Sequence, residues 1–445
     1  MKHSLVRERS FPEFFFLFII IAFGVISTFV TFPLTNGDEG YHLSRSYTIF
    51  SRNNPISMET DAVRAIELVT ISENLGERNF DVDSFFRTKL PDVEKDKVSF
   101  NLQKDDNSTL GIDVGHMPAA IGSLIGRFIY PSYGVILIFS RLANLVFFAI
   151  CLFFIIRFSS VGKWSLFMLF SVPFIQKLAS PSYDVFSYVV VSAFAVNLLT
   201  LAKLSDFKKA SKKQISYTLL TILLIFFAKN NYIFILPSLL FLPMFTNRII
   251  KLYRKQSRQL RIIFWIILLI ILCIGIYYSN RIFGLENFAR QFFNSYFNVA
   301  TMGRRGRTLF NVAPTILPDM FNIFWILSLF FVMMTEKKHS WNLFFILGTI
   351  IVFFINWFGI YAGFYLMLNK PMQALDELSG RYLHPFIICF LPFTQLVSYK
   401  YNLVSSQKAV KFVSITSTLL IMITYLIVCY YRGYIIQTTP TWGTR

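Results

Sequence analysis

The sequence predicts an all-α, polytopic integral membrane protein with about eleven transmembrane helices. Apolar residues make up 55% of the 445-residue chain, and runs of about 18 or more of them recur along most of its length. The 43 Lys and Arg residues outnumber the 24 acidic ones, and many of them lie in alternate short loops between the runs. These observations favour a single transmembrane domain over residues 1–445.

Each predicted span is an apolar run long enough to cross a bilayer as a helix. The first run, which ends near Leu34, is too long for a signal-peptide core and is interpreted as a retained anchor. The predicted spans cover roughly residues 12–34, 134–156, 164–180, 184–202, 214–228, 231–246, 262–279, 319–335, 341–358, 382–399 and 411–430.

The short loops predict the orientation. With a cytoplasmic N-terminus, every short inside loop is basic, for example at residues 203–213 and 248–261. This arrangement satisfies the positive-inside rule and places the C-terminus outside. The basic excess is therefore a topology signal, helped by anionic lipid of the inner leaflet, and nucleic acid is not an expected partner. All four cysteines lie in apolar spans, so no disulfide framework is expected.

The large hydrophilic loop, residues 35–131, follows the first span and is predicted to be extracytoplasmic. At 100° per residue, its first part reads as an amphipathic helix lying on the bilayer surface, apolar face down. Its polar stripe is Asp38, His42, Arg45 and Arg52, and its apolar stripe is Leu43, Tyr47 and Phe50. A second helix is expected at 58–75, an irregular segment at 79–110, and a short interfacial or re-entrant stretch at 119–129.

Unusual polar side chains collect near the predicted outer ends of six segments. An acid there can take the proton of a hydroxyl, and fixed cations can neutralise the charge on a departing phosphate, which favours transfer of a group from a phosphate carrier. Carboxylates at a membrane boundary are costly unless hydrated or paired, so the adjacent Asp38 and Glu39 indicate function. The candidates are Asp38, Glu39, His42, Arg45, His116, Tyr183, Asp184, Lys229, Asn230, Arg381 and His384.

Structural interpretations compete with each functional one. Asp38 and Glu39 can stabilise a helix N-terminus, with Glu39 as the capping residue. His42 and Arg45 can form pairs within their own helix.

The later cations have structural alternatives too. Lys229 can snorkel at the boundary, and Arg381 can be a simple boundary arginine. Arg141, about two turns into the second span, must face protein or a water-filled cavity, and a cross-helix pair with Asp184 is preferred for it over donor binding.

Six motifs occur in a characteristic order: Asp38-Glu39-Gly40-Tyr41-His42, Gly126-Arg127, Arg141-Leu142-Ala143-Asn144, Ala179-Ser180-Pro181-Ser182-Tyr183-Asp184, Lys229-Asn230-Asn231-Tyr232 and Gly380-Arg381-Tyr382-Leu383-His384-Pro385. Together they cover nearly the whole chain, and the series resembles a bacterial family of multi-pass membrane proteins, domain of unknown function 2142, which is grouped with the GT-C glycosyltransferases. Where many members have Pro or Phe near the acidic pair and Gln before Gly-Arg-Tyr, this chain has Gly37 and Ser379.

The resemblance implies a GT-C fold in the bacterial cytoplasmic (inner) membrane, with its active site on the extracytoplasmic face. It also implies a polyprenyl-phosphate sugar donor, such as an undecaprenyl-phosphate sugar, and a glycan or glycopolymer acceptor in the cell envelope. Asp38 and Glu39 match the position, just after the first span, where enzymes of the GT-C fold commonly have their catalytic acid. Arg381 and Lys229 are the cations that match a donor-phosphate site.

The expected reaction is a single displacement with inversion, in which Asp38 takes the acceptor proton. Arg381, Lys229 and Arg45 are expected to hold the lipid phosphate. No metal is required, although the Asp38–Glu39 pair can coordinate a divalent cation such as Mg²⁺ or Mn²⁺. The substrate-pocket candidates are His42, His116, Tyr183, Asp184, Asn230 and His384.

Other classes of function fit parts of the sequence. A flippase or transporter of lipid-linked glycans also needs cations for a lipid phosphate, but it should have charged groups deep in its spans and inverted repeats. A polymerase or ligase that uses lipid-diphosphate donors would rely on loop arginines such as Arg304 and Arg305. A non-catalytic scaffold would not need polar residues from six segments.

Overall fold

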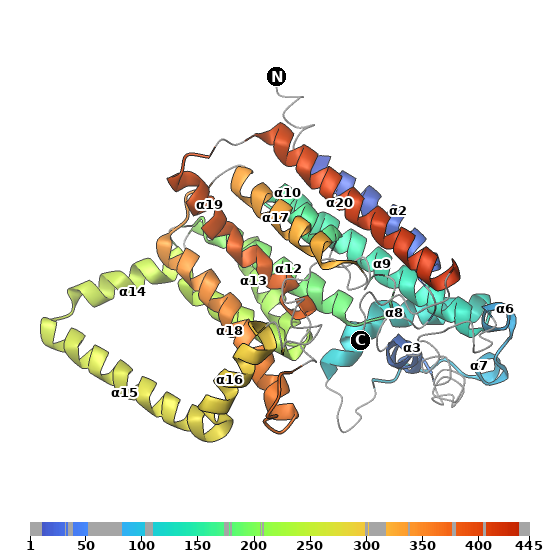
Figure 1. The fold of residues 1–445 in the computed structure, drawn as a ribbon, viewed down its shortest axis with the longest axis horizontal. Helices are drawn as coiled ribbons and strands as arrows, with labels where there is room; N and C mark the ends of the chain where they lie inside the picture. The colour runs from blue at the N-terminus through green and yellow to red at the C-terminus, as the bar shows by residue number, and fades with distance from the viewer. Residues whose placement is uncertain are drawn as a thin grey trace.

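A computed structural model of the chain shows long helices packed side by side, with shorter helices gathered at one end (Figure 1). Within the part that it describes, the chain is helical, with one isolated β-bridge between Ser51 and Val98. The described residues are 11–31, 33, 39–51, 82–102, 110–172, 178, 180–204, 206, 209–298, 301, 317–336, 339–375, 380–403 and 406–435.

Six described helices are long and apolar enough to cross a membrane. A seventh crossing exists if the bent pair η3 (Asn230–Phe241) and α14 (Pro243–Lys255), which meet at 55°, forms one span. The six are α2 (Phe11–Val30), α9 (Tyr133–Phe158), α12 (Asp184–Leu201), α15 (Arg258–Phe283), α18 (Leu343–Met367) and α20 (Gln407–Tyr430).

The remaining four predicted spans contain shorter helices. Two prolines interrupt the segment 382–399, because Pro385 lies at the start of η6 and Pro392 at the start of α19, and proline cannot donate a backbone hydrogen bond. The structure thus shows six or seven helices of spanning length, and the count of about eleven stays a prediction. The shorter helices are α10 (Lys163–Ser171), α13 (Lys212–Ile225), α17 (Asp319–Thr335), η6 (His384–Phe390) and α19 (Leu391–Lys400).

Helix α12 lies at the centre of the bundle and is buried on nearly every side. It packs against α9, α13, η3 and η6, which explains why its apolar residues show no single preferred face. The surrounding hydrophobic core is continuous from Phe16 in α2 to Cys429 in α20.

Helix α8 (Leu110–Ile129) packs closely along α9 and is longer than the stretch expected at 119–129, whose interfacial or re-entrant placement stays a prediction. Small residues permit this approach, as they do where membrane helices cross. A Cβ atom on Gly122 would lie 2.2 Å from the backbone oxygen of Phe139. Beside it, the hydroxyls of Ser123 and Ser140 are hydrogen bonded at 2.7 Å.

We expect Gly122→Ala to destabilise the protein by about 1–3 kcal/mol, because the added methyl group must push α8 away from the α9 backbone. Thermal unfolding of the purified protein in detergent measures this loss. Gly275→Ala in α15 is the matched control, since a Cβ there meets nothing within 4 Å and alanine favours a helix. Equal unfolding temperatures for the two variants would contradict the packing argument.

The segment η3 is a 3-10 helix of 12 residues, much longer than is usual for this geometry. Pro237 lies within it. Two glycines of α18 make room for its aromatic side chains, because Gly348 lies against Phe241 and Gly359 against Phe234. Packing on α18 therefore holds a backbone geometry that is weak in isolation.

A hairpin of helices leaves the bundle on one side (Figure 1). It runs from α14 through α15 to α16 (Leu285–Tyr296), and no residue of α15 is buried. Helix α16 returns to the bundle, where Phe288 packs on Tyr361 and Asn287 donates a 2.8 Å hydrogen bond to the Tyr365 hydroxyl. An apolar helix exposed on every face is suited to surrounding lipid.

The end of the bundle near the start of α10 has its own buried carboxylate. Glu336, just after α17, accepts hydrogen bonds from the backbone nitrogens of Trp164 and Ser165 and from the Ser165 hydroxyl. These bonds satisfy backbone donors at the start of α10 that have no partner within the helix. Burial raises the pKa of Glu336, and the hydrogen bonds partly oppose that rise.

The first loop contributes α3 (Glu39–Thr48), α6 (Val82–Arg87) and α7 (Pro91–Lys95). The segment 79–110 is therefore less irregular than expected. The helix expected at 58–75 lies outside the described residues.

Candidate functional site

Helix α3 is inserted between the ends of other helices, which corrects the expectation that it lies on the bilayer surface. It packs against α8 and α9, and its His42, Arg45, Leu43 and Tyr47 side chains are buried. The apolar side chains of Leu43 and Tyr47 join a small cluster with Ile136 and Leu137 of α9. The polar side chains of His42 and Arg45 are buried against protein, so the cost of their burial must be met by pairing.

Glu39, the first residue of α3, is bound by Arg141 of α9. The guanidinium Nε and Nη2 donate to the two carboxylate oxygens at 2.9 Å each, and the two side chains are at most 1% exposed. Arg141 Nη1 also donates to the backbone oxygens of Thr28 and Thr31 at the end of α2. One buried arginine thus joins the end of α2 to the start of α3, and the preferred pairing of Arg141 with Asp184 is wrong.

Two side chains of α3 reach across to α8. Arg45 Nε and Nη2 each lie 2.7 Å from Asp113 Oδ1. One turn earlier, His42 Nδ1 and His116 Nε2 form a 2.9 Å hydrogen bond. His42 and Arg45 therefore both form pairs between helices α3 and α8.

The histidine pair leads to the start of α12. The Tyr183 ring lies 5.4 Å from the His42 ring and 5.3 Å from the His116 ring, centroid to centroid. On its other side, Lys229 Nζ lies 5.0 Å from the Tyr183 ring centroid and 2.8 Å from Asp184 Oδ1. Polar and aromatic groups from α3, α8, α12 and the start of η3 therefore form one connected cluster.

Lys229 is also covered by Tyr382 of η5 (Gly380–Tyr382), with Nζ 4.3 Å from the ring centroid. Two hydrogen bonds fix the backbone around Lys229. The Lys229 backbone nitrogen donates to the Ser187 hydroxyl, and the Asn356 side chain of α18 donates to the backbone oxygen of Tyr382. Two aromatic faces and a carboxylate stabilise the ammonium group.

The turn before α12 is held from α9. Asn144 Nδ2 donates to the backbone oxygens of Ser180 and Ser182 at 3.0 and 3.2 Å. Asn144 follows Arg141 by three residues, so one face of α9 positions both α3 and Tyr183.

The three ion pairs differ in access to solvent. The side chains are 1% and 0% exposed in Arg141–Glu39, 7% and 2% in Arg45–Asp113, and 16% and 8% in Lys229–Asp184. The first two pairs therefore have the burial expected of structural pairs, whereas Lys229 is the cation most open to an approaching anion. Burial raises the pKa of Tyr183, and the nearby Lys229 charge opposes that rise, so Tyr183 stays a hydrogen-bond donor at neutral pH.

The other predicted site residues have different outcomes. Asn230 is exposed at the start of η3, and His384 is buried in η6, two residues beyond Tyr382. Arg381 lies in η5 beside Tyr382, and the structure describes its backbone only. Asp38, Arg304 and Arg305 lie outside the described residues. Asp38 immediately precedes Glu39, whose position is fixed by Arg141.

The described residues contain no group of three or more His, Cys, Asp or Glu side chains arranged to hold a metal ion. Both Glu39 oxygens accept hydrogen bonds from Arg141. Asp38 lies outside the described residues, so a divalent-cation site on the Asp38–Glu39 pair stays a prediction.

Asp113 and Tyr382 are site residues that the sequence interpretation missed. Asp113 and His116 are spaced by three residues, as are His42 and Arg45, so each pair lies on one helix face. The equal spacing of the two pairs was the sequence feature from which the contact between α3 and α8 could have been predicted. Tyr382 belongs to the Gly380–Pro385 motif, but no pattern marked it as the residue that covers Lys229.

A sequence profile of the family described as "Predicted membrane protein (DUF2142)" matches residues 19–299, well over half of the chain. The motif at 380–385 lies beyond the matched range, so the match is shorter than the predicted resemblance. No curated protein and no solved structure matches the chain.

Proposed function

This chain belongs to the DUF2142 family of predicted membrane proteins, and from that premise we propose that it is a GT-C-type glycosyltransferase. It moves a sugar from a polyprenyl-phosphate donor to a glycan or glycopolymer acceptor. The proposal includes about eleven crossings of the bacterial cytoplasmic membrane, with the N-terminus in the cytoplasm. The cluster at the end of α2 then faces the extracytoplasmic side.

The observation that carries this proposal is the partly exposed Lys229 at a boundary between apolar helices and a polar loop. A polyprenyl phosphate has the same division, with a hydrocarbon chain in the membrane and an anion at its surface. A lysine ammonium group held beside two aromatic faces can bind a phosphate oxygen. Arg381 is the second cation proposed for the phosphate, because η5 places its backbone beside Tyr382.

The reaction is a displacement at the anomeric carbon of the donor. The acceptor oxygen forms a bond to that carbon, the bond to the phosphate oxygen breaks, and the configuration inverts. Asp38 takes the proton of the acceptor hydroxyl, and the polyprenyl phosphate leaves with an additional negative charge that Lys229 and Arg381 stabilise. Glu39 and Arg45 act as positioning residues, through Arg141 and Asp113 respectively.

The test is transfer of a labelled sugar from synthetic polyprenyl-phosphate donors to envelope glycans by the purified full-length protein. We expect Lys229→Gln to lower kcat/KM by about 10- to 100-fold, since a hydrogen bond to a charged group contributes roughly 1.5–3 kcal/mol. Lys229→Arg keeps the charge next to Asp184 and should retain more activity. Lys400→Gln, an exposed cation of α19, is the matched control.

Three outcomes would overturn the proposal. Absence of transfer by wild-type protein with several sugars would remove the enzyme assignment. Transfer from diphosphate donors alone would favour a polymerase or ligase. Movement of the intact lipid-linked glycan across a vesicle membrane, without transfer, would favour a flippase.

A further inference from the structure

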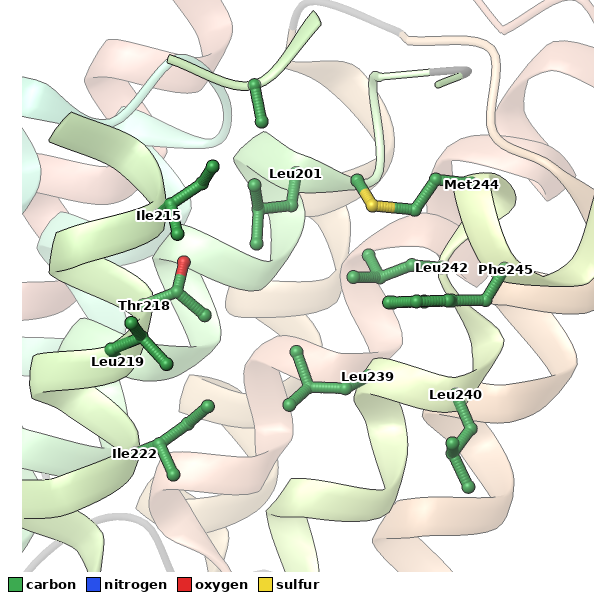
Figure 2. Close-up of a pocket in the computed structure, with 11 residues that line it drawn as sticks. Leu201, Ile215, Thr218, Leu219, Ile222, Leu239, Leu240, Leu242, Met244 and Phe245 are labelled. Carbon is green, nitrogen blue, oxygen red and sulfur yellow. The ribbon is translucent and has the colours of Figure 1, made fainter. Parts of the chain in front are cut away.

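A cavity of about 270 Å³ lies between α13 and the junction of η3 with α14. Figure 2 shows side chains of α13 on one wall and of η3 and α14 on the other. The cavity is at the end of η3 opposite Lys229, so it is separate from the candidate site. Its lining includes Leu201, Ile215, Leu219, Ile222, Leu239 and Met244.

The cavity offers almost no polar group. Its one hydroxyl side chain, Thr218, already donates to the Gln214 oxygen at 2.7 Å and accepts from Asn197 at 2.8 Å. Apolar cavities of this kind stay dry and take apolar ligands. In a membrane protein, the hydrocarbon available to fill the cavity is a lipid chain.

Cations lie one turn beyond the cavity on both walls. Lys212 precedes Ile215 by three residues in α13, and Arg248 follows Met244 by four residues in α14. These spacings place each cation on the cavity face of its helix. Both side chains are exposed, and neither forms an ion pair with a residue that the structure describes.

Lys212 has a well-defined position in the first turn of α13, where its positive charge destabilises the helix. A capping box fixes the start of α13, with Ser211 and Gln214 each accepting a hydrogen bond from the other's backbone nitrogen. Cations in the first turn oppose the helix dipole, and this first turn contains no acidic residue. An anion bound at this end would relieve that unfavourable charge.

We propose that the cavity holds one acyl chain of an anionic phospholipid whose phosphate is bound by Lys212 and Arg248. Basic pockets between transmembrane helices bind anionic head groups in this way on the cytoplasmic side of membranes. The inference rests on the cavity and its charged rim and does not depend on glycosyl transfer.

The experiment uses the full-length protein, delipidated in detergent and supplied with dioleoyl phosphatidylglycerol or dioleoyl phosphatidylcholine. Native mass spectrometry counts the lipids that each preparation retains. We expect wild-type protein to retain one phosphatidylglycerol in preference to phosphatidylcholine. A cation near an anionic head group contributes about fivefold, so K212Q/R248Q should lose about 30-fold of this preference.

Two further variants separate the chain from the head group. A210W places an indole in the loop that lines the cavity, and it should abolish retention of the bound lipid irrespective of head group. K213Q is the matched control for charge, because Lys213 lies on the side of α13 away from Ile215, and it should behave as wild type.

Several results would overturn the inference. One is equal retention of the two lipids by wild-type protein. Another is an equal loss of preference in K213Q, which would show diffuse attraction to the basic surface. Displacement of phosphatidylglycerol by stoichiometric undecaprenyl phosphate would instead assign the cavity to the isoprenoid chain.

Discussion

Asp38→Asn is expected to lower sugar transfer by about 10²- to 10⁴-fold, the usual contribution of a general base. Asparagine keeps the shape of the side chain and stabilises a helix N-terminus as well as aspartate does, so the unfolding temperature should not change. Donor binding should also persist, because the phosphate contacts are assigned to Lys229 and Arg381. The measurement compares transfer, donor binding and thermal unfolding of the variant with those of wild type.

Two controls make the Asp38 result specific. Asp92→Asn, in the exposed part of α7 within the same loop, should leave transfer unchanged. Glu39→Gln removes the neighbouring charge, but it should act mainly on stability because Glu39 is buried against Arg141. Full activity of Asp38→Asn, together with loss of transfer in a stably folded Glu39→Gln, would exchange the roles of the two carboxylates.

Arg141→Met should destabilise the protein by about 3–5 kcal/mol, the range seen when one partner of a buried ion pair is removed. The substitution leaves the Glu39 carboxylate without its cation and the Thr28 and Thr31 oxygens without their donor. Thermal and chemical unfolding in detergent measure the loss.

The double variant Glu39→Met/Arg141→Met distinguishes two causes of lost stability: loss of the ion pair itself, and burial of a charge that has no partner. It should recover part of the stability lost in Arg141→Met, because no charged group then remains buried. Glu94→Gln breaks the exposed Lys89–Glu94 pair and should change stability little. A double variant no more stable than Arg141→Met would show that the cost lies in packing around the arginine.

The sequence predicted which residues are unusual better than it predicted their partners. Arg141 had to face protein, since a charge eight residues into an apolar helix is too costly in lipid, and it does. Its partner lies 102 residues away, a separation about which helix periodicity carries no information. Asp184, near in the predicted topology, binds Lys229 instead.

The amphipathic pattern of α3 was read correctly as a helix and wrongly as a surface helix. A polar stripe shows that a face meets polar groups, but it does not distinguish water from another protein helix. Asp113 and His116 provide those groups here. Glu336 was missed for a related reason, because its partners are backbone nitrogens of α10, which have no sequence signature.

Hydropathy also overestimated the length of single helices. An apolar run is long enough to cross a membrane whether or not its backbone is one helix, and it does not report the breaks at Pro385 and Pro392. The apolar run over 231–246 likewise contains the 3-10 segment η3 and the bend before α14.

The end-to-end length of η3 depends on its type of helix. Twelve residues extend about 24 Å as a 3-10 helix and about 18 Å as an α-helix. Conversion of η3 to an α-helix would therefore shorten it by about 6 Å and rotate one end relative to the other about the helix axis. Lys229 stands at one end and the apolar cavity at the other. A change in the winding of η3 would therefore alter the distance between Lys229 and the cavity.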